Sequence, residues 1–190
     1  MSLFVAVRPD ARATEDLQDA VDSARRQWTG PGLRWQPPSQ WHLTLAFLGN
    51  PGEDVTFEVA ERLHAVTNWP AVTGARIQGA GSFGGKVLWM GLEEGPARGA
   101  LGSMARDILR LLRGSGVTAD FRPWQAHLTL ARSRKGSATD MVDLLDRYSG
   151  PPWDVTELLL IRSTGGPKPA HHVAARYSLA GSLPSDDSSR

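Results

Sequence analysis

The chain of 190 residues is 41% hydrophobic and 22% charged, which is typical of a globular protein made of one domain or of two closely packed lobes. Its formal net charge of +1 argues against sequence-independent coating of nucleic acid, although a small basic cleft for one RNA end stays open. The absence of cysteine excludes disulfides, thiolate catalysis and cysteine-ligated metal centres. No signal peptide or membrane span is recognisable, so we expect a cytoplasmic protein with no membrane partner.

Apolar periodicity and the positions of glycine and proline predict strands and helices along the whole chain. In order, we expect a strand at 3–8, a helix at 14–28 capped by Thr14, strands at 33–36 and 41–48, a helix at 55–66, strands at 72–80 and 86–92, a helix at 101–112, strands at 117–121 and 126–131, a short helix at 139–148 capped by Thr139, and strands at 155–162 and 173–179. Strands joined by hairpins or single helices favour an α+β fold with largely antiparallel sheets.

Three further features complete this organisation. The glycine-rich segment 79–85 is expected to be a hairpin loop, since neither Gly-Lys-Ser/Thr nor a helix start follows it. Residues 1–183 are expected to form a single bilobal domain. Residues 184–190, which are rich in serine and aspartate, are expected to be a disordered tail.

One five-residue segment occurs twice: His42–Ala46 recurs letter for letter as His127–Ala131. Each copy lies in a short apolar run, and in a strand successive side chains point to opposite faces. Histidine and threonine, two positions apart, therefore share one face while the leucines share the other. Because a helix is predicted after each copy, the repetition suggests a diverged duplication that folds as two similar lobes.

Two imidazoles and two hydroxyls around one small group suit a phosphodiester. Opening a cyclic phosphodiester with water needs a base on the water and an acid on the departing sugar oxygen, and the ordinary pKa of histidine suits both roles. The hydroxyls of Thr44 and Thr129 can donate to the non-bridging phosphate oxygens. No acidic cluster with metal-ligand spacing lies near either copy, so we expect neither a metal ion nor another cofactor.

Paired His-x-Thr-x motifs at this spacing resemble the signature of the 2H phosphoesterase superfamily. The segments that carry the resemblance are Phe4-Val5-Ala6-Val7, Arg34-Trp35, His42 to Gly49 and His127 to Arg132. They are similar to the bacterial RNA 2′,3′-cyclic phosphodiesterase family, also called ThpR or LigT and historically 2′-5′ RNA ligase. The resemblance runs from about residue 3 to residue 179, and it is the pair of motifs that makes it specific.

This resemblance implies a bilobal LigT-like α+β fold. Two mostly antiparallel sheets with outer helices, related by a pseudo-two-fold duplication, would place both motifs in a central cleft. The implied reaction is hydrolysis of an RNA 2′,3′-cyclic phosphate to a 2′-phosphate end, with a reversible, ATP-independent 2′-5′ ligation as an accompanying activity. By similarity, His42 is the general acid on the leaving 3′ oxygen and His127 the general base that activates water.

The same resemblance assigns roles to the neighbours of the histidines. Thr44 and Thr129 match the threonines that hold the phosphate. Arg132 matches the arginine after the second motif, and it reaches the phosphate if a bulge or turn redirects it; otherwise it forms a surface ion pair. Phe47 matches the aromatic residue after the first motif and is a candidate for base stacking, with a place in the core as the alternative. The expected partner is an RNA or oligonucleotide 3′ end with a cyclic phosphate, and the expected state is a monomer.

The chain departs from the family pattern in two places, and other functions stay open. Family members usually have proline directly before the second motif histidine, where this chain has Ala126, with Pro123 earlier. The pair His171-His172 could be a metal pair or an RNA contact, although adjacent strand residues face opposite ways. The alternatives in function are a phosphodiesterase for small cyclic nucleotides or 2′-5′ oligonucleotides, and a nucleotide-binding module without turnover.

Overall fold

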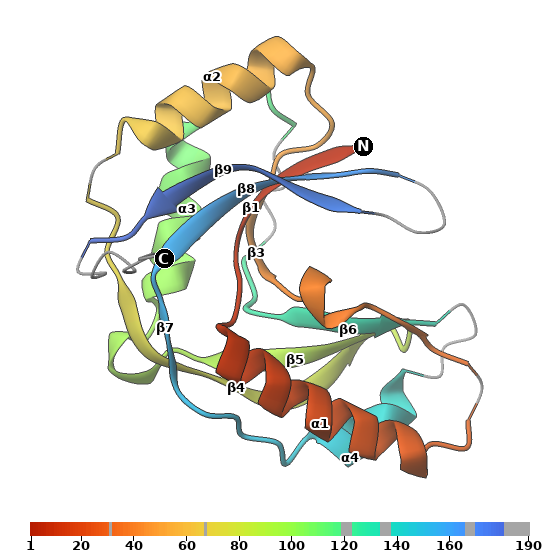
Figure 1. The fold of residues 1–190 in the computed structure, drawn as a ribbon. Helices are drawn as coiled ribbons and strands as arrows, with labels where there is room; N and C mark the ends of the chain where they lie inside the picture. The colour runs from red at the N-terminus through yellow and green to blue at the C-terminus, as the bar shows by residue number, and fades with distance from the viewer. Residues whose placement is uncertain (31, 67, 119–122, 134–137, 166–169, 181–190) are drawn as a thin grey trace, which may run out of the picture.

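The computed structural model describes residues 1–190 except 31, 67, 119–122, 134–137, 166–169 and 181–190 (Figure 1). Its strands are β1 (Ser2–Val7), β2 (Arg34–Trp35), β3 (Leu43–Phe47), β4 (Val72–Phe83), β5 (Val87–Glu93), β6 (Leu128–Arg132), β7 (Trp153–Val155), β8 (Glu157–Ser163) and β9 (His171–Ser178). Its α-helices are α1 (Ala11–Gln27), α2 (Glu53–His64), α3 (Ala100–Leu111) and α4 (Val142–Leu145). Single 3-10 turns lie at Pro38–Gln40, Gly95–Ala97 and Thr139–Met141.

The strands pair antiparallel in one curled path, in the order β7-β4-β5-β6-β3-β1-β8-β9, and β2 pairs with β6 at the side. The two halves of this path correspond to the two expected sheets, because β3 and β6 meet at the single residue pair Leu43 and Leu128. On one side lie β3, β1, β8 and β9, and on the other β6, β5, β4 and β7. The predicted α+β fold with antiparallel strands is confirmed.

Each lobe is covered by two helices, and one of the two comes from a distant part of the chain (Figure 1). Helix α1 follows β1 in the sequence but packs on β4 and α4 of the other lobe. Helix α3 follows β5 but packs on β3 of the first lobe. Helix α2 covers the same lobe, where it contacts α3 and β9. The buried stripe of α3, which includes Leu101, Met104, Ala105 and Ile108, supplies the apolar face that packs against the sheet. A single large core cluster of buried residues spans both lobes.

The two motif strands have the same local irregularity. In β3, Val5 and Ala6 of the neighbouring strand pair with Ala46 and Thr44, so Leu45 is an extra residue. In β6, the neighbours pair with Ala131 and Thr129, so the equivalent Leu130 is extra. An extra residue of this kind is a β-bulge, which bends the strand and redirects the side chains beyond it. The duplication inferred from the repeat therefore extends to the backbone of both motifs.

Several boundaries differ from the sequence-based expectations. Helix α1 begins earlier than predicted, since the side chain of Asp10, and not Thr14, caps it by accepting from Ala13 N at 2.7 Å. Strand β4 continues through most of the predicted loop at 79–85 and ends at Phe83. Thr139 makes no cap bond to the short helix and instead shares a hydrogen bond of 3.0 Å with Ser82. Residues 117 and 118 of the strand predicted at 117–121 are irregular, and the rest of it, like the tail at 184–190, lies outside the described residues.

Candidate active site

A pocket of about 270 Å³ lies where the two motif strands meet. The six site residues predicted from the sequence all line it: His42, Thr44, Phe47, His127, Thr129 and Arg132. They come from β3 and β6 and from the residue that precedes each strand. Because Leu43 and Leu128 are direct partners across the sheet, the histidines one position earlier in each strand approach each other from the two lobes.

The bulges determine which side chains after the threonines reach this pocket. In a regular strand, the alternation would place Ala46 and Ala131 on the face of the motif histidines and threonines. The extra residue in each strand changes this alternation. Leu45 and Ala46 are both buried and Phe47 is exposed, and Leu130, Ala131 and Arg132 repeat the same pattern. The ring of Phe47 and the guanidinium of Arg132 therefore belong to the pocket.

Both motif imidazoles are held in the same way. His42 Nδ1 lies 2.6 Å from the carbonyl oxygen of Gln40, and His127 Nδ1 lies 2.9 Å from that of Gln125. A carbonyl oxygen only accepts hydrogen bonds, so each Nδ1 carries the proton and donates it. The other ring nitrogen, Nε2, is then the atom that exchanges a proton with a ligand. The two histidines thus present the same nitrogen from two sides of the pocket.

The ring of His42 is enclosed by two other rings. It stacks on Phe4 with a centroid distance of 4.9 Å, and His171 meets it edge-on at 5.1 Å. Burial lowers the pKa of His42 to about 4, and the positive fields of His171, Arg8 and His127 act in the same direction. The hydrogen bond to Gln40 opposes this shift. At neutral pH the His42 imidazole is consequently uncharged while the pocket is empty.

The surroundings of His127 are different. The ring of Phe83, at the end of β4, meets it edge-on with a centroid distance of 4.9 Å. Phe83 is itself 37% exposed and packs beside Trp89 at a centroid distance of 5.2 Å. Among the described residues, His127 therefore contacts the ring of Phe83, whereas His42 contacts the rings of both Phe4 and His171. The two imidazoles occupy chemically unequal positions despite their identical motifs.

Sequence reasoning missed several residues that line the pocket. Arg34 in β2 is the register partner of Arg132 in β6, so two guanidinium groups are brought to one side of the pocket. His171 reaches the pocket because β9 pairs with β8, which in turn pairs with β1. Burial and the charges of Arg8 and His172 lower the pKa of His171. Only strand order, which the sequence does not encode locally, places residue 171 beside residue 42.

Two other kinds of functional feature are absent from the part of the chain that the structure describes. There, no group of three or more histidine, aspartate or glutamate side chains is arranged to hold a metal ion. Nor does any helix in that part combine the length and the apolar character needed to cross a membrane. Of the pair His171-His172, His171 lines the pocket and His172 does not. This agrees with the rule that adjacent residues of a strand point to opposite faces of the sheet.

Comparison with known proteins places these features in a family. A family model described as the 2′-5′ RNA ligase superfamily matches residues 9–167. A relative from Thermus thermophilus named RNA 2′,3′-cyclic phosphodiesterase is 30% identical over 95% of this chain and 91% of the relative. A relative of the same name from Archaeoglobus fulgidus is 29% identical over 83% of this chain and 86% of its own length. A third, from Geobacillus stearothermophilus, is 27% identical, and the chain spans 49% of its length.

Solved structures with the same fold agree with this. A crystal structure of Escherichia coli LigT complexed with 3′-AMP has a TM-score of 0.74 at 23% identity, and the match covers 94% of this chain and 98% of that one. A Thermus thermophilus structure has a TM-score of 0.69 at 26% identity, with 96% and 100% of the two chains covered. The predicted LigT-like fold is therefore confirmed by structures that share only about a quarter of their residues with this chain.

Proposed function

The chain belongs to the 2′-5′ RNA ligase superfamily, and from this premise we propose that it hydrolyses RNA 2′,3′-cyclic phosphate ends to 2′-phosphate ends. The relatives named RNA 2′,3′-cyclic phosphodiesterase support the reaction. The observation that carries the proposal is the convergence of two identical motifs on one pocket, with Nδ1 of each histidine donating to a backbone carbonyl. A binding module needs no such pair of proton-transfer groups.

In the proposed step, a water oxygen forms a bond to phosphorus while the bond between phosphorus and the 3′ oxygen breaks. His127 Nε2 accepts the proton of the attacking water, and His42 Nε2 donates a proton to the departing 3′ oxygen. The phosphoryl group stays on the 2′ oxygen. The two histidines end the step with their protonation states exchanged, and solvent restores them. A 5′-hydroxyl in place of water would give the 2′-5′ linkage by the same route.

His42 must be protonated to act as the acid, although it is neutral in the empty pocket. The substrate itself supplies the compensating charge, because a phosphodiester is an anion. At about 4 Å and an effective dielectric constant of about 20, one negative charge favours the imidazolium by roughly 4 kcal/mol. Since one pKa unit corresponds to about 1.4 kcal/mol, this is comparable with the gap between a pKa of about 4 and neutral pH. Binding of the substrate therefore charges the acid that acts on it.

The remaining residues of the pocket are proposed to hold the anion and the base. Thr44 and Thr129 donate hydroxyl hydrogen bonds to the non-bridging oxygens. Arg34 in β2 and Arg132 in β6 are register partners, and both line the pocket. Their guanidinium groups can bind the phosphate by charge-assisted hydrogen bonds. Phe47, which is 44% exposed at the pocket, offers a ring to the nucleobase.

These groups supply acid, base and charge stabilisation without a metal, so we propose a metal-independent reaction. The test is release of a 2′-phosphate from an oligonucleotide with a 2′,3′-cyclic end, with EDTA present. His42→Ala and His127→Ala should each reduce the rate about 10²–10⁴-fold. His64→Ala, on the exposed end of α2, is the matched control and should keep the wild-type rate.

The outcomes of this assay separate the candidate functions. Turnover of the oligonucleotide by the wild type and the control, but not by the two motif variants, supports the proposal. Turnover of nucleoside 2′,3′-cyclic phosphates alone would replace the RNA substrate by a small cyclic nucleotide. Binding with no turnover of either would leave a nucleotide-binding module. Loss of activity in EDTA that added metal restores would refute metal independence.

A further inference from the structure

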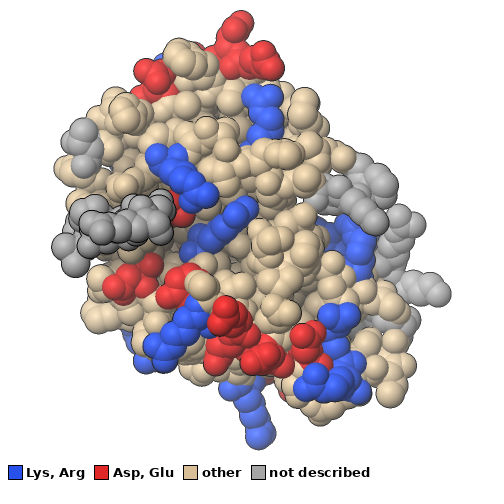
Figure 2. Space-filling model, viewed as in Figure 1, with Lys and Arg blue, Asp and Glu red and all other residues tan. Residues whose placement is uncertain are grey.

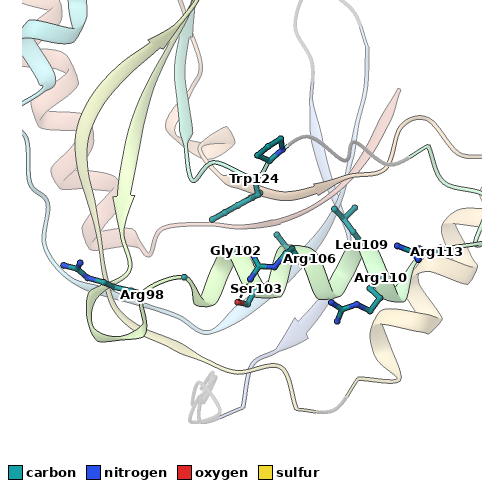
Figure 3. A pocket seen from close by; sticks show the side chains of 11 residues that line it. Arg98, Gly102, Ser103, Arg106, Leu109, Arg110, Arg113 and Trp124 are labelled. Carbon is teal, nitrogen blue, oxygen red and sulfur yellow. Dashed lines mark hydrogen bonds between the residues drawn. The ribbon is translucent and has the colours of Figure 1, made fainter.

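We propose that a second site, on the outer side of the sheet, binds the sugar–phosphate backbone of the RNA upstream of its cyclic end. This inference rests on the function proposed above and extends it to the body of the substrate. The site is a groove of about 730 Å³ between α3 and the segment that leads into β6 (Figure 3). Its lining includes Arg98, Arg106, Arg110, Arg113 and Trp124, and we call it the arginine groove.

The charge of the arginine groove is unusual for this protein. No acidic side chain is among the described residues that line it. Arg106 donates to Ser103 at 2.8 Å, and Arg110 pairs with Asp107 at 2.7 Å in a bridge whose two side chains are 72% and 53% exposed. Such an exposed bridge competes weakly with an anionic ligand. On the face that Figure 2 shows, acidic and basic side chains instead lie next to one another over α1.

The spacing of the arginines suits an extended polyanion better than a single phosphate. Arg98 lies before α3 and Arg113 beyond its end, so the two mark opposite ends of the helix in Figure 3. The 12 residues of α3 span about 18 Å at a rise of about 1.5 Å per residue. A single phosphate group could contact arginines from only one part of this length. A nucleic acid strand carries successive phosphates along it.

Trp124 adds a rigid aromatic surface to this row of cations. Its indole Nε1 donates to the carbonyl oxygen of Thr44 at 2.9 Å. On the other side the ring packs against α3 at Gly102, where a Cβ atom would come within 3.3 Å of the indole Cε3. The ring is therefore fixed at both edges while part of it faces the groove. A basic groove with a fixed aromatic ring is the combination that binds single strands through phosphates and stacked bases.

The groove lies close to the pocket along the chain itself. Trp124 lines the groove and His127, three residues later, lines the pocket, so their Cα atoms are at most about 11 Å apart. Thr44 connects the same two places, because its carbonyl oxygen accepts from Trp124 while the residue also lines the pocket. The linings of the two sites are therefore close to each other at this point, and we place the nucleotides upstream of the cyclic end along this route.

The experiment compares two double variants that remove the same charge. R106Q/R113Q neutralises two arginines of the groove, and R12Q/R26Q neutralises two exposed arginines of α1 on the other lobe. Binding of a 12-nucleotide RNA with a plain 3′-hydroxyl end is measured at 50 and 200 mM salt. Michaelis constants are measured for the same RNA with a 2′,3′-cyclic end and for a nucleoside 2′,3′-cyclic phosphate.

Each single-strand phosphate contact contributes about 0.7 to the slope of log affinity against log salt. Loss of two contacts lowers the slope by about 1.4, so wild-type affinity should fall about sevenfold more than that of R106Q/R113Q between the two salt concentrations. The Michaelis constant of R106Q/R113Q should rise for the cyclic-ended RNA and stay unchanged for the nucleoside. R12Q/R26Q should match the wild type in every measurement.

Two results would overturn the proposal. One is an equal loss of RNA affinity in R106Q/R113Q and R12Q/R26Q. The other is a Michaelis constant of R106Q/R113Q that rises as much for the nucleoside 2′,3′-cyclic phosphate as for the cyclic-ended RNA. Displacement of the RNA by polyglutamate at equal charge concentration would overturn it in favour of an acidic protein partner. These results are distinguishable from failure of the proposed function. If no cyclic phosphate is turned over by the wild type, salt-dependent RNA binding still tests the groove. If turnover is normal but the groove variant binds RNA as the wild type does, only the groove proposal fails.

Discussion

Acidification should destabilise this protein through His42. Its pKa is 6.5 in an unfolded chain and about 4 in the folded protein, so the unfolded state binds a proton more readily at intermediate pH. The stabilisation that comes from a neutral His42 is therefore present above pH 6.5 and is lost as the pH falls towards 4. Linkage gives a loss of about 2 kcal/mol between pH 7 and about pH 5. With an m-value near 2 kcal/mol per molar, the urea midpoint falls by roughly 1 M.

The measurement is urea unfolding at both pH values for the wild type and for His42→Gln. The variant changes absolute stability by an unrelated amount, so the informative quantity is the difference between its two midpoints. We expect this difference to be about 1 M smaller in the variant than in the wild type. His64→Gln, an exposed histidine of α2, serves as the control and should behave as the wild type. Identical pH dependence in the wild type and His42→Gln would refute the burial of an uncharged imidazole.

Three further predictions concern the pocket. His127→Gln should lower kcat about 10²–10⁴-fold and remove one limb of the bell-shaped pH–rate profile. Thr129→Val should lower kcat less. A flat profile in the wild type between about pH 5 and 9 would contradict the pairing of the histidines. Arg132→Lys keeps the charge but loses the planar fork, so kcat/KM should fall about tenfold with little change in the unfolding midpoint, and full activity would exclude bidentate phosphate binding. His171→Asn removes a positive neighbour, so the pKa of His42, measured by NMR titration, should rise; an unchanged value would refute their electrostatic coupling.

The motif repeat was sufficient to predict six residues that line one pocket, but the strict alternation of a strand does not explain how two of them reach it. Alternation places Ala131 on the face of His127 and leaves Arg132 to an unspecified bulge or turn. The structure has the bulge at Leu130, which changes the alternation. A bulge depends on how two strands fit together, and the same letters in one strand allow either register. The equivalent bulge at Leu45 shows that the irregularity belongs to both copies of the motif.

Residues far from the motifs were harder to assign. The sequence predicted that His171 and His172 face opposite ways but not that β9 would bring His171 beside His42, because that contact requires two intervening strand pairings. Local competition explains a smaller error at the first helix. Thr14 and Asp10 both can cap, and Asp10, directly after a proline, takes the extended conformation that a cap needs.

The exchange of helices between the lobes has a consequence for how the molecule can be divided. Helix α1 is encoded with the first lobe but covers the second, and α3 is encoded with the second but covers the first. A fragment that ends between the two repeats would leave the apolar face of α1 uncovered and would strip β3 of the helix it needs. Neither half should fold in isolation, and the whole chain should unfold in one cooperative transition. Such distant pairings also predict slow folding, with the two imidazoles meeting only late in the process.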